Sequence, residues 1–334
     1  MVKGESLLPL RERSAIVLLS RGGYRVGGSL TAEGQGRVVP ARGRWARGLW
    51  IELRPRHWVK NLLVLAPLLF SYNLLAPVAV ARALMAFTLF CLISSSVYLL
   101  NDIQDCEQDR LHPQKRYRPL ATGELGVGVA LGMMVVLLLC ALAGGVVLSK
   151  PFALILFGYW FINLLYSAWL KHQVILDVFA IAAGFVLRVV GGALAIQVEM
   201  SDWLLICASL LALFLGFSKR RHELVLLGEE AAGHRQVLEE YNPRFLDMMI
   251  GIVTASTVMS YALYTVSEET VRKFHTRGLL LTLPFVLYGV FRYLYLVYHK
   301  DQGGDPTQSL LTDRPMVINL CLWAMTAGII LYWK

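Results

Sequence analysis

The feature that most constrains this chain is a series of apolar stretches, each about as long as a helix that crosses a bilayer. Backbone amides in lipid need partners within their own segment, so such stretches form helices. Hydrophobic residues make up 56% of the 334 residues and the mean hydropathy is +0.55, which excludes an ordinary soluble domain. We predict an all-α integral membrane protein with about nine transmembrane helices, at 59–77, 79–101, 124–148, 152–170, 174–196, 203–218, 246–266, 278–298 and 315–333.

Basic residues are concentrated near the N-terminus, where twelve of the 32 Lys and Arg lie in the first sixty residues. Residues 1–48 are rich in Gly and Arg and hold no apolar stretch long enough to cross a membrane or to act as a signal peptide. We expect a flexible basic cytoplasmic tail at 1–48 and a transmembrane domain at 49–334. The basic loops at 102–123 and 218–245 should also face the cytoplasm, although Arg272, Lys273 and Arg277 depart from this pattern.

An acidic run, Asn101 to Asp109, follows the second apolar stretch. Asp102, Asp105 and Asp109 have the spacing i, i+3, i+7, so they share one face if the helix continues. Carboxylates at a helix centre in lipid would cost roughly 2.5–3.5 kcal/mol each, so we expect them to face a polar cavity and to bind a cation. Oxygen ligands of this type suit Mg²⁺ completed by phosphate oxygens. The alternative is an acidic loop in water.

Basic side chains that follow this acidic run, and others at the start of the first predicted span and the end of the sixth, could neutralise phosphate oxygens. They are Lys60, Lys115, Arg116, Arg118, Lys219 and Arg220. The alternative is that these bases only orient the chain in the membrane, as cytoplasmic bases commonly do. Scattered cysteines and histidines show no disulfide or metal-binding spacing.

A second polar group surrounds the turn between the fourth and fifth predicted spans, where Tyr166, Lys171 and Asp177 lie. Arg188 follows Asp177 on nearly the same helical face, about 16 Å further along the helix at 1.5 Å per residue. An arginine at that depth in lipid is a candidate ligand for a lipid phosphate. It is equally consistent with a structural arginine bound to carbonyl oxygens.

The run from Asn101 to Asp109 resembles the first signature of the UbiA superfamily of intramembrane prenyltransferases, Asn-Asp-x-x-Asp-x-x-x-Asp. Further matches resemble the branch of this superfamily that includes the decaprenyl-phosphate phosphoribosyltransferases. They comprise Arg54 to Asn61, His112 to Pro119, Tyr166-Ser167, Leu170 to Gln173, Leu176-Asp177, Lys219-Arg220 with Glu223, and Glu240-Tyr241. The resemblance covers roughly residues 50–334. It implies a UbiA-type bundle with a cytoplasm-facing polar cavity in a bacterial inner membrane, Mg²⁺ as cofactor, and a lateral opening for a polyprenyl tail.

The resemblance also implies an activity, a Mg²⁺-dependent transfer of 5-phosphoribosyl from 5-phosphoribosyl 1-diphosphate to a polyprenyl phosphate, with inversion at the anomeric carbon. We expect Asp102, Asp105 and Asp109 to bind the metal, and these with Lys171 and Asp177 to be the catalytic residues. The expected substrate-binding residues are Lys60, Asn61, Asn101, Lys115, Arg116, Arg118, Tyr166, Arg188, Lys219, Arg220 and Glu223.

Two other functions fit parts of the pattern. An aromatic prenyltransferase would use the same aspartates on a polyprenyl diphosphate, but that type usually carries a second Asp-x-x-x-Asp pair, where this chain offers only Asp177. A transporter or lipid-binding protein would use buried charges for passage, but no inverted repeat or broken helix pair indicates one. We expect no nucleic-acid partner. The sequence leaves open whether the chain forms a homo-oligomer and how long the acceptor lipid is.

Overall fold

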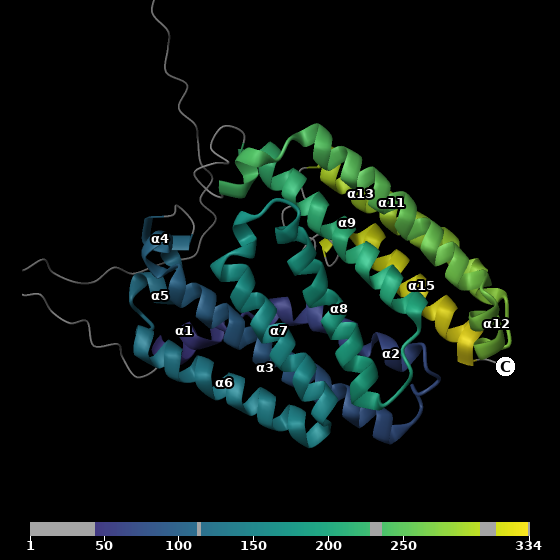
Figure 1. Cartoon of the computed structure of the whole chain (residues 1–334), viewed down its shortest axis with the longest axis horizontal. Coiled ribbons are helices and arrows are strands. Elements are labelled where there is room, and N and C mark those ends of the chain that lie inside the picture. Colours follow the sequence, from purple (N-terminus) through teal and green to yellow (C-terminus); the bar gives the residue numbers. More distant parts are fainter. Residues whose placement is uncertain (1–43, 112–114, 228–235, 301–311, 333–334) are drawn as a thin grey trace, which may run out of the picture. The chain divides into compact units, whose positions relative to one another are not determined.

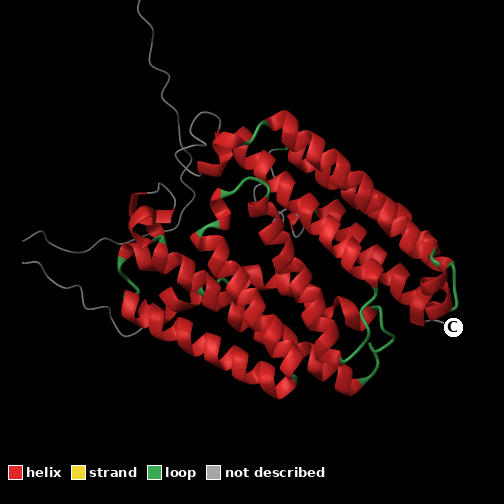
Figure 2. Cartoon of the chain, viewed as in Figure 1, coloured by secondary structure: helices red, strands yellow, loops and turns green. Residues whose placement is uncertain are grey.

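The computed structural model describes residues 44–111, 115–227, 236–300 and 312–332, all within the unit formed by residues 40–334. Every regular element in these ranges is helical (Figure 2). Eight helices in the described ranges are long and apolar enough to cross a membrane, and they match eight of the predicted spans. They are α3 (Pro77–Gln104), α6 (Val127–Leu148), α7 (Lys150–Ala168), α8 (Leu176–Ile196), α9 (Asp202–Leu227), α11 (Pro243–Val266), α13 (Leu283–His299) with the preceding 3-10 turn η6 (Gly278–Thr282), and α15 (Arg314–Tyr332).

The prediction of a first span at 59–77 is wrong as a continuous α-helix. This region contains a 3-10 helix, η1 (Pro55–Leu65), and a short α-helix, α2 (Ala66–Leu69), before a turn that leads to α3. Pro67 has no backbone N–H and would clash with a carbonyl one turn earlier in a continuous helix, so it lies in the first turn of α2 instead. The domain boundary predicted at residue 48 falls within α1 (Arg44–Glu52), and residues 1–43 lie outside the described residues.

Short helices connect the long ones at the membrane ends. They are α4 (Cys106–Leu111), η2 (Lys115–Tyr117), α5 (Pro119–Thr122), η3 (Leu170–His172), η5 (Gln236–Glu240) and α12 (Glu268–Phe274). Residues that cap the helices mark several of the junctions. Ser149 accepts a bond from the backbone N–H of Phe152 at the start of α7, and Asn242 accepts one from Arg244 at the start of α11.

Helices that follow one another in the chain pack side by side, α3 with α6, α6 with α7, α7 with α8, and α8 with α9 (Figure 1). One apolar cluster joins η1, α3, α6, α7 and α8 around Phe90, whose ring meets Phe152 and Tyr159 edge to face. A second cluster joins α8, α9, α11 and α13 around Phe214 and Tyr293. Many apolar side chains outside these clusters are exposed on the protein surface, as a multi-pass membrane protein requires.

The alternating helix directions place the carboxyl ends of α3, α7 and α9 beside the amino ends of α8 and α11. Hydrogen bonds link Ser167 to Asn101 and Arg220 to Asp177, which joins these ends. At the opposite end Arg82 donates to the carbonyl oxygens of Ala195 and Leu148, at 2.7 and 3.0 Å. The bundle therefore has one end where charged side chains gather and another where an arginine satisfies helix carbonyls.

Gly192 in α8 lies directly against the backbone of η1. A Cβ at this position would stand 2.0 Å from the carbonyl oxygen of Val64, which is a backbone atom and cannot swing aside. Only glycine allows this close approach, and it places η1 against α8 at the depth of the polar residues Asn61 and Arg188.

We therefore predict that Gly192→Ala destabilises the protein by more than the ~1–3 kcal/mol typical of an overpacked core. Thermal unfolding in detergent would show a lower midpoint and a lower yield of monodisperse protein. Gly158→Ala is the control, since a Cβ at Gly158 meets nothing within 4 Å. Equal midpoints for the two variants would contradict the close packing of η1 on α8.

Candidate active site at one end of the bundle

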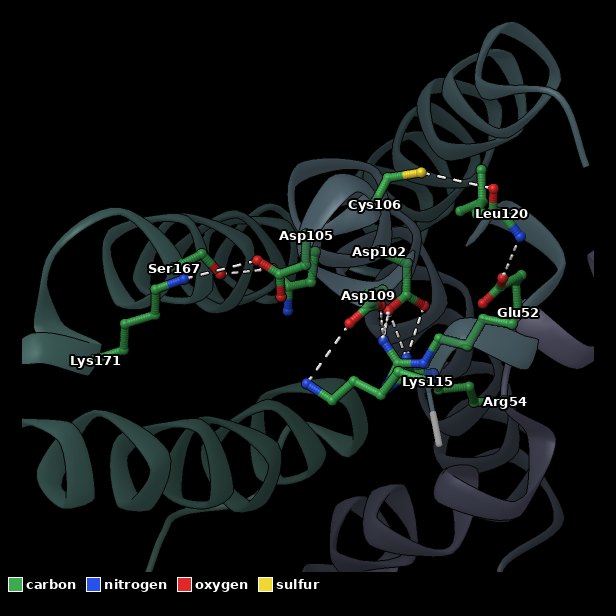
Figure 3. Close-up of polar contacts among 12 residues, drawn as sticks. Glu52, Arg54, Asp102, Asp105, Cys106, Asp109, Lys115, Leu120, Ser167 and Lys171 are labelled. Atoms are coloured by element: carbon green, nitrogen blue, oxygen red, sulfur yellow. Dashed lines mark hydrogen bonds and ion pairs between the residues drawn. The ribbon is translucent and has the colours of Figure 1, made fainter. Parts of the chain in front are cut away.

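Two buried carboxylates, Asp102 at the end of α3 and Asp109 in α4, lie close together (Figure 3). Arg118 Nη1 donates to Asp102 Oδ1 at 2.8 Å and also to Asp109 Oδ2. Arg54 Nη2 donates to both oxygens of Asp102, at 2.6 and 2.7 Å. Lys115 Nζ lies 3.7 Å from Asp109 Oδ1. We call these five side chains the aspartate cluster.

Asp105 does not join the aspartate cluster. Helix α3 ends at Gln104, Asp105 occupies the break, and α4 begins at Cys106, so the helix does not continue regularly through the acidic run. The Asp105 carboxylate instead lies 3.9 Å from Lys171 Nζ, on the side where Ser167 bonds to Asn101 (Figure 3). The structure thus separates Asp105 from the other two aspartates, which the expectation of one shared helix face did not foresee.

Arg54 has a left-handed backbone conformation, with φ 52° and ψ 58°, at the residue before η1. This region is sparsely populated by residues other than glycine, asparagine and aspartate. The Arg54 N–H donates to the carbonyl of Ile51 and the Arg54 carbonyl accepts from His57, which holds the turn in place. An unusual backbone beside clustered charges is typical of functional sites.

Glu52 was not predicted as a site residue, although it is buried beside Asp102. Its Oε1 accepts a bond from the backbone N–H of Leu120 at 3.1 Å. Burial, together with the hydrogen bond and negative charge of Asp102, raises the pKa of Glu52 to about 7. Only its place beside the Arg54 run hinted at this role, because no spacing pattern links residue 52 to residue 102.

A second group of buried polar side chains joins α7, α8, α9 and the residue that follows η5. Arg220 Nε donates to Asp177, and Tyr241 donates to the other Asp177 oxygen at 2.7 Å. Arg220 also donates to Glu223 at 2.6 Å and to the Tyr166 hydroxyl at 3.2 Å. Asp177 and Arg220 are almost completely buried, so this pair ties helices together. Tyr241, which the sequence interpretation left out of the site, completes the pair.

Arg188 lies deeper in the bundle and bonds neutral acceptors. Its guanidinium donates to Asn61 Oδ1 at 2.7 Å, to the Gly184 carbonyl at 2.7 Å and to the Tyr159 hydroxyl at 2.9 Å. The ring of Tyr159 also lies beneath its charge, at 4.7 Å. Of the two interpretations of Arg188, these contacts agree with a structural arginine, because they hold η1, α7 and α8 together.

Three other bases were predicted to bind substrate, Lys219, Arg116 and Lys60. Lys219 is partly exposed, with its amine 3.7 Å from Glu223. Arg116 is exposed and donates to the Tyr117 hydroxyl, and Lys60 is half-buried on η1. Residues 112–114, which belong to the motif beginning at His112, lie outside the described residues.

The donor set of the aspartate cluster fits a divalent cation in part. Across the described ranges no three His, Cys, Asp or Glu side chains converge. Asp102 and Asp109 nevertheless share one cationic nitrogen, Arg118 Nη1, which shows that both carboxylates can reach the same positive charge. Two carboxylates completed by water and phosphate oxygens suit Mg²⁺. Asp102 and Asp109 are therefore the side chains that could hold it.

A cavity of about 680 Å³ lies elsewhere, between α11 and α13. Its lining is mainly apolar, with Asp247, Tyr298 and His299 at one end. None of the predicted site residues lines it.

The model of the UbiA prenyltransferase family matches residues 63–311. The decaprenyl-phosphate phosphoribosyltransferase of Mycolicibacterium smegmatis is 32% identical over 302 residues, which cover 86% of this chain and 93% of that protein. The protein of the same name from Corynebacterium glutamicum is 33% identical, covering 86% of this chain and 87% of that protein.

A solved structure also resembles this fold. A UbiA homologue from Archaeoglobus fulgidus, bound to GPP and Mg²⁺, has a TM-score of 0.66 and 20% sequence identity, and the match covers 85% of this chain and 99% of that one. This likeness supports the UbiA-type helical bundle.

The raised pKa of Glu52 predicts how stability depends on pH. The folded protein keeps a proton on Glu52 up to about pH 7, whereas the unfolded chain loses it near 4.5. Between these values the folded state binds more protons, so its stability falls as the pH rises. Glu52→Gln should flatten this slope in thermal unfolding measured in detergent without divalent cations.

Glu124→Gln is the control for this prediction, because Glu124 is exposed. It should leave the slope as in the wild type. A Glu52→Gln variant with an unchanged slope would show that another group titrates in this range.

Proposed function

The chain belongs to the UbiA prenyltransferase family, and we propose that it transfers the 5-phosphoribosyl group from 5-phosphoribosyl 1-diphosphate to a polyprenyl phosphate of decaprenyl type. The relatives that are about one third identical over most of this chain carry the name of that activity. The observation that carries the proposal is the aspartate cluster, where two buried carboxylates meet three cationic side chains. Such a cluster matches a ligand that combines a metal ion with several phosphates.

Asp102 and Asp109 would hold the Mg²⁺ of the donor complex. Bound Mg²⁺ would neutralise the charge that develops on the departing diphosphate. Lys60, Lys115 and Lys219 would bind other phosphate oxygens, and Lys171, oriented by Asp105, would contribute a further charge. Fixed cations around the leaving group lower the barrier to its departure.

The acceptor phosphate would attack the anomeric carbon from the face opposite the diphosphate. The new carbon–oxygen bond forms as the bond to diphosphate breaks, so the configuration inverts. A phosphate monoester has a second pKa near 6 and is largely a dianion at neutral pH, so this attack needs no general base.

The second polar group favours phosphoribosyl transfer over aromatic prenylation. Asp177 accepts hydrogen bonds from Arg220 and Tyr241 that tie it into the helix framework, and positions 173 and 181 hold no second aspartate for an Asp-x-x-x-Asp pair. We place the active site on the cytoplasmic side of a bacterial inner membrane, since the bases at this end, including Arg110, Lys115 and Arg118, follow the positive-inside rule.

We predict that the purified protein in detergent consumes labelled 5-phosphoribosyl 1-diphosphate when polyprenyl phosphate is supplied, and that a chelator abolishes this reaction. Asp102→Asn should lower the rate by at least about 10²-fold, because one ligand charge is lost. A parallel reaction contains polyprenyl diphosphate and 4-hydroxybenzoate. Product in the parallel reaction alone would replace this proposal with aromatic prenylation.

Lys171 and His172 form a matched pair for testing the turn that follows α7. Lys171→Ala should lower the rate about tenfold or more, because it removes a charged contact with the donor and releases Asp105. His172 is exposed, so His172→Ala should retain nearly full activity. Equal losses in the same transferase assay would remove Lys171 from the site.

A further inference from the structure

Both oxygens of Asp102 already accept hydrogen bonds from arginine. Its two oxygens receive three hydrogen bonds, two from Arg54 at 2.6 and 2.7 Å and one from Arg118 at 2.8 Å. Its side chain is only 3% exposed. Because Arg54 contacts both oxygens of this buried carboxylate, a metal ion that binds Asp102 competes with its guanidinium.

Charge makes the entry of a bare metal ion unfavourable as well. The aspartate cluster holds two carboxylates against three cations, so its net charge is already positive. A divalent cation would add two further charges beside buried carboxylates, where electrostatic repulsion is stronger than in bulk solvent. A diphosphate that arrives with the metal brings enough negative charge to compensate.

Arg54 is placed to change partners. Its side chain is 24% exposed, unlike Arg220 in the second polar group, which is 1% exposed and bonded to three protein side chains. The guanidinium also lies 5.2 Å from the centre of the Tyr98 ring, whose face can bind a cation. A planar guanidinium fits two phosphate oxygens as well as two carboxylate oxygens.

From this arrangement we propose that Arg54 is an internal counter-cation that blocks Asp102 until metal and diphosphate arrive together. On arrival Arg54 leaves the carboxylate and binds a diphosphate oxygen, while Asp102 becomes free to bind the metal. This inference rests on the proposed function, because it takes Asp102 as a metal ligand. Its consequence is a strong positive coupling, in which diphosphate tightens metal binding and metal tightens diphosphate binding by the same factor.

Arg54→Asn tests this proposal, because asparagine tolerates the left-handed backbone of residue 54 and removes the charge. Binding of radioactive Mn²⁺ to the purified protein would be measured by rapid gel filtration, with and without inorganic diphosphate. In the wild type, diphosphate should tighten Mn²⁺ binding strongly. In Arg54→Asn, Mn²⁺ alone should bind about tenfold tighter, and the tightening by diphosphate should shrink by about the same factor.

Three further variants test whether the charge of Arg54 is what weakens the binding of Mn²⁺ alone. Arg54→Lys keeps a charge and should bind Mn²⁺ alone less tightly than Arg54→Asn. Arg110→Asn removes a nearby charge that pairs with Glu107 and does not contact Asp102, so it should behave as the wild type. If Arg54→Asn does not yield folded protein, Arg118→Gln removes the other guanidinium on Asp102 and should raise the affinity for Mn²⁺ alone in the same direction.

The outcomes distinguish this inference from the proposed function. Mn²⁺ could bind with diphosphate in every protein, while Mn²⁺ alone binds no tighter to Arg54→Asn or Arg118→Gln than to the wild type. That result would overturn the counter-cation role and leave the metal role of Asp102 intact. Absence of Mn²⁺ binding in all proteins, even with diphosphate, overturns both.

Discussion

Neutralisation of buried carboxylates by arginine is the interaction on which the polar end of this bundle depends. A carboxylate without a partner at the end of an apolar helix would be strongly unfavourable, and each buried aspartate in the described ranges is paired with a cation. Asp102 pairs with Arg54 and Arg118, and Asp177 pairs with Arg220. Because the partners come from distant parts of the chain, the same contacts that neutralise charge also join η1, α3, α8 and α9.

The two charged groups differ in what they can do. The Asp177–Arg220 pair is buried and completed by Tyr241 and Glu223, so it acts as a fixed part of the framework. The guanidiniums around Asp102 remain about a quarter exposed, and the backbone of Arg54 has an unusual conformation. This combination suits a transferase. The buried Asp177–Arg220 pair holds the helices in place, while the partly exposed guanidiniums on Asp102 can exchange partners when the donor enters.

Several site residues could be found from spacing and composition. Asp102 and Asp109 belong to a short local pattern, and Lys115 and Arg118 follow them closely in the chain. Glu52 and Tyr241 could not be found in this way, because each acts on a residue more than forty positions away. Asp105 shows the limit of helical spacing, since one break in the backbone turned its side chain toward Lys171.

Apolar length alone determined the helical membrane fold, because backbone amides in lipid can be satisfied only within a helix, and it placed eight of the spans. The tertiary structure decided the conformation of the remaining predicted span, residues 59–77. There Gly192 admits the Val64 carbonyl, and η1 adopts a 3-10 conformation against α8. It also decided which charges meet, because periodicity orients a side chain only within its own helix, whereas Arg54 and Asp102 are brought together by the packing of separate elements.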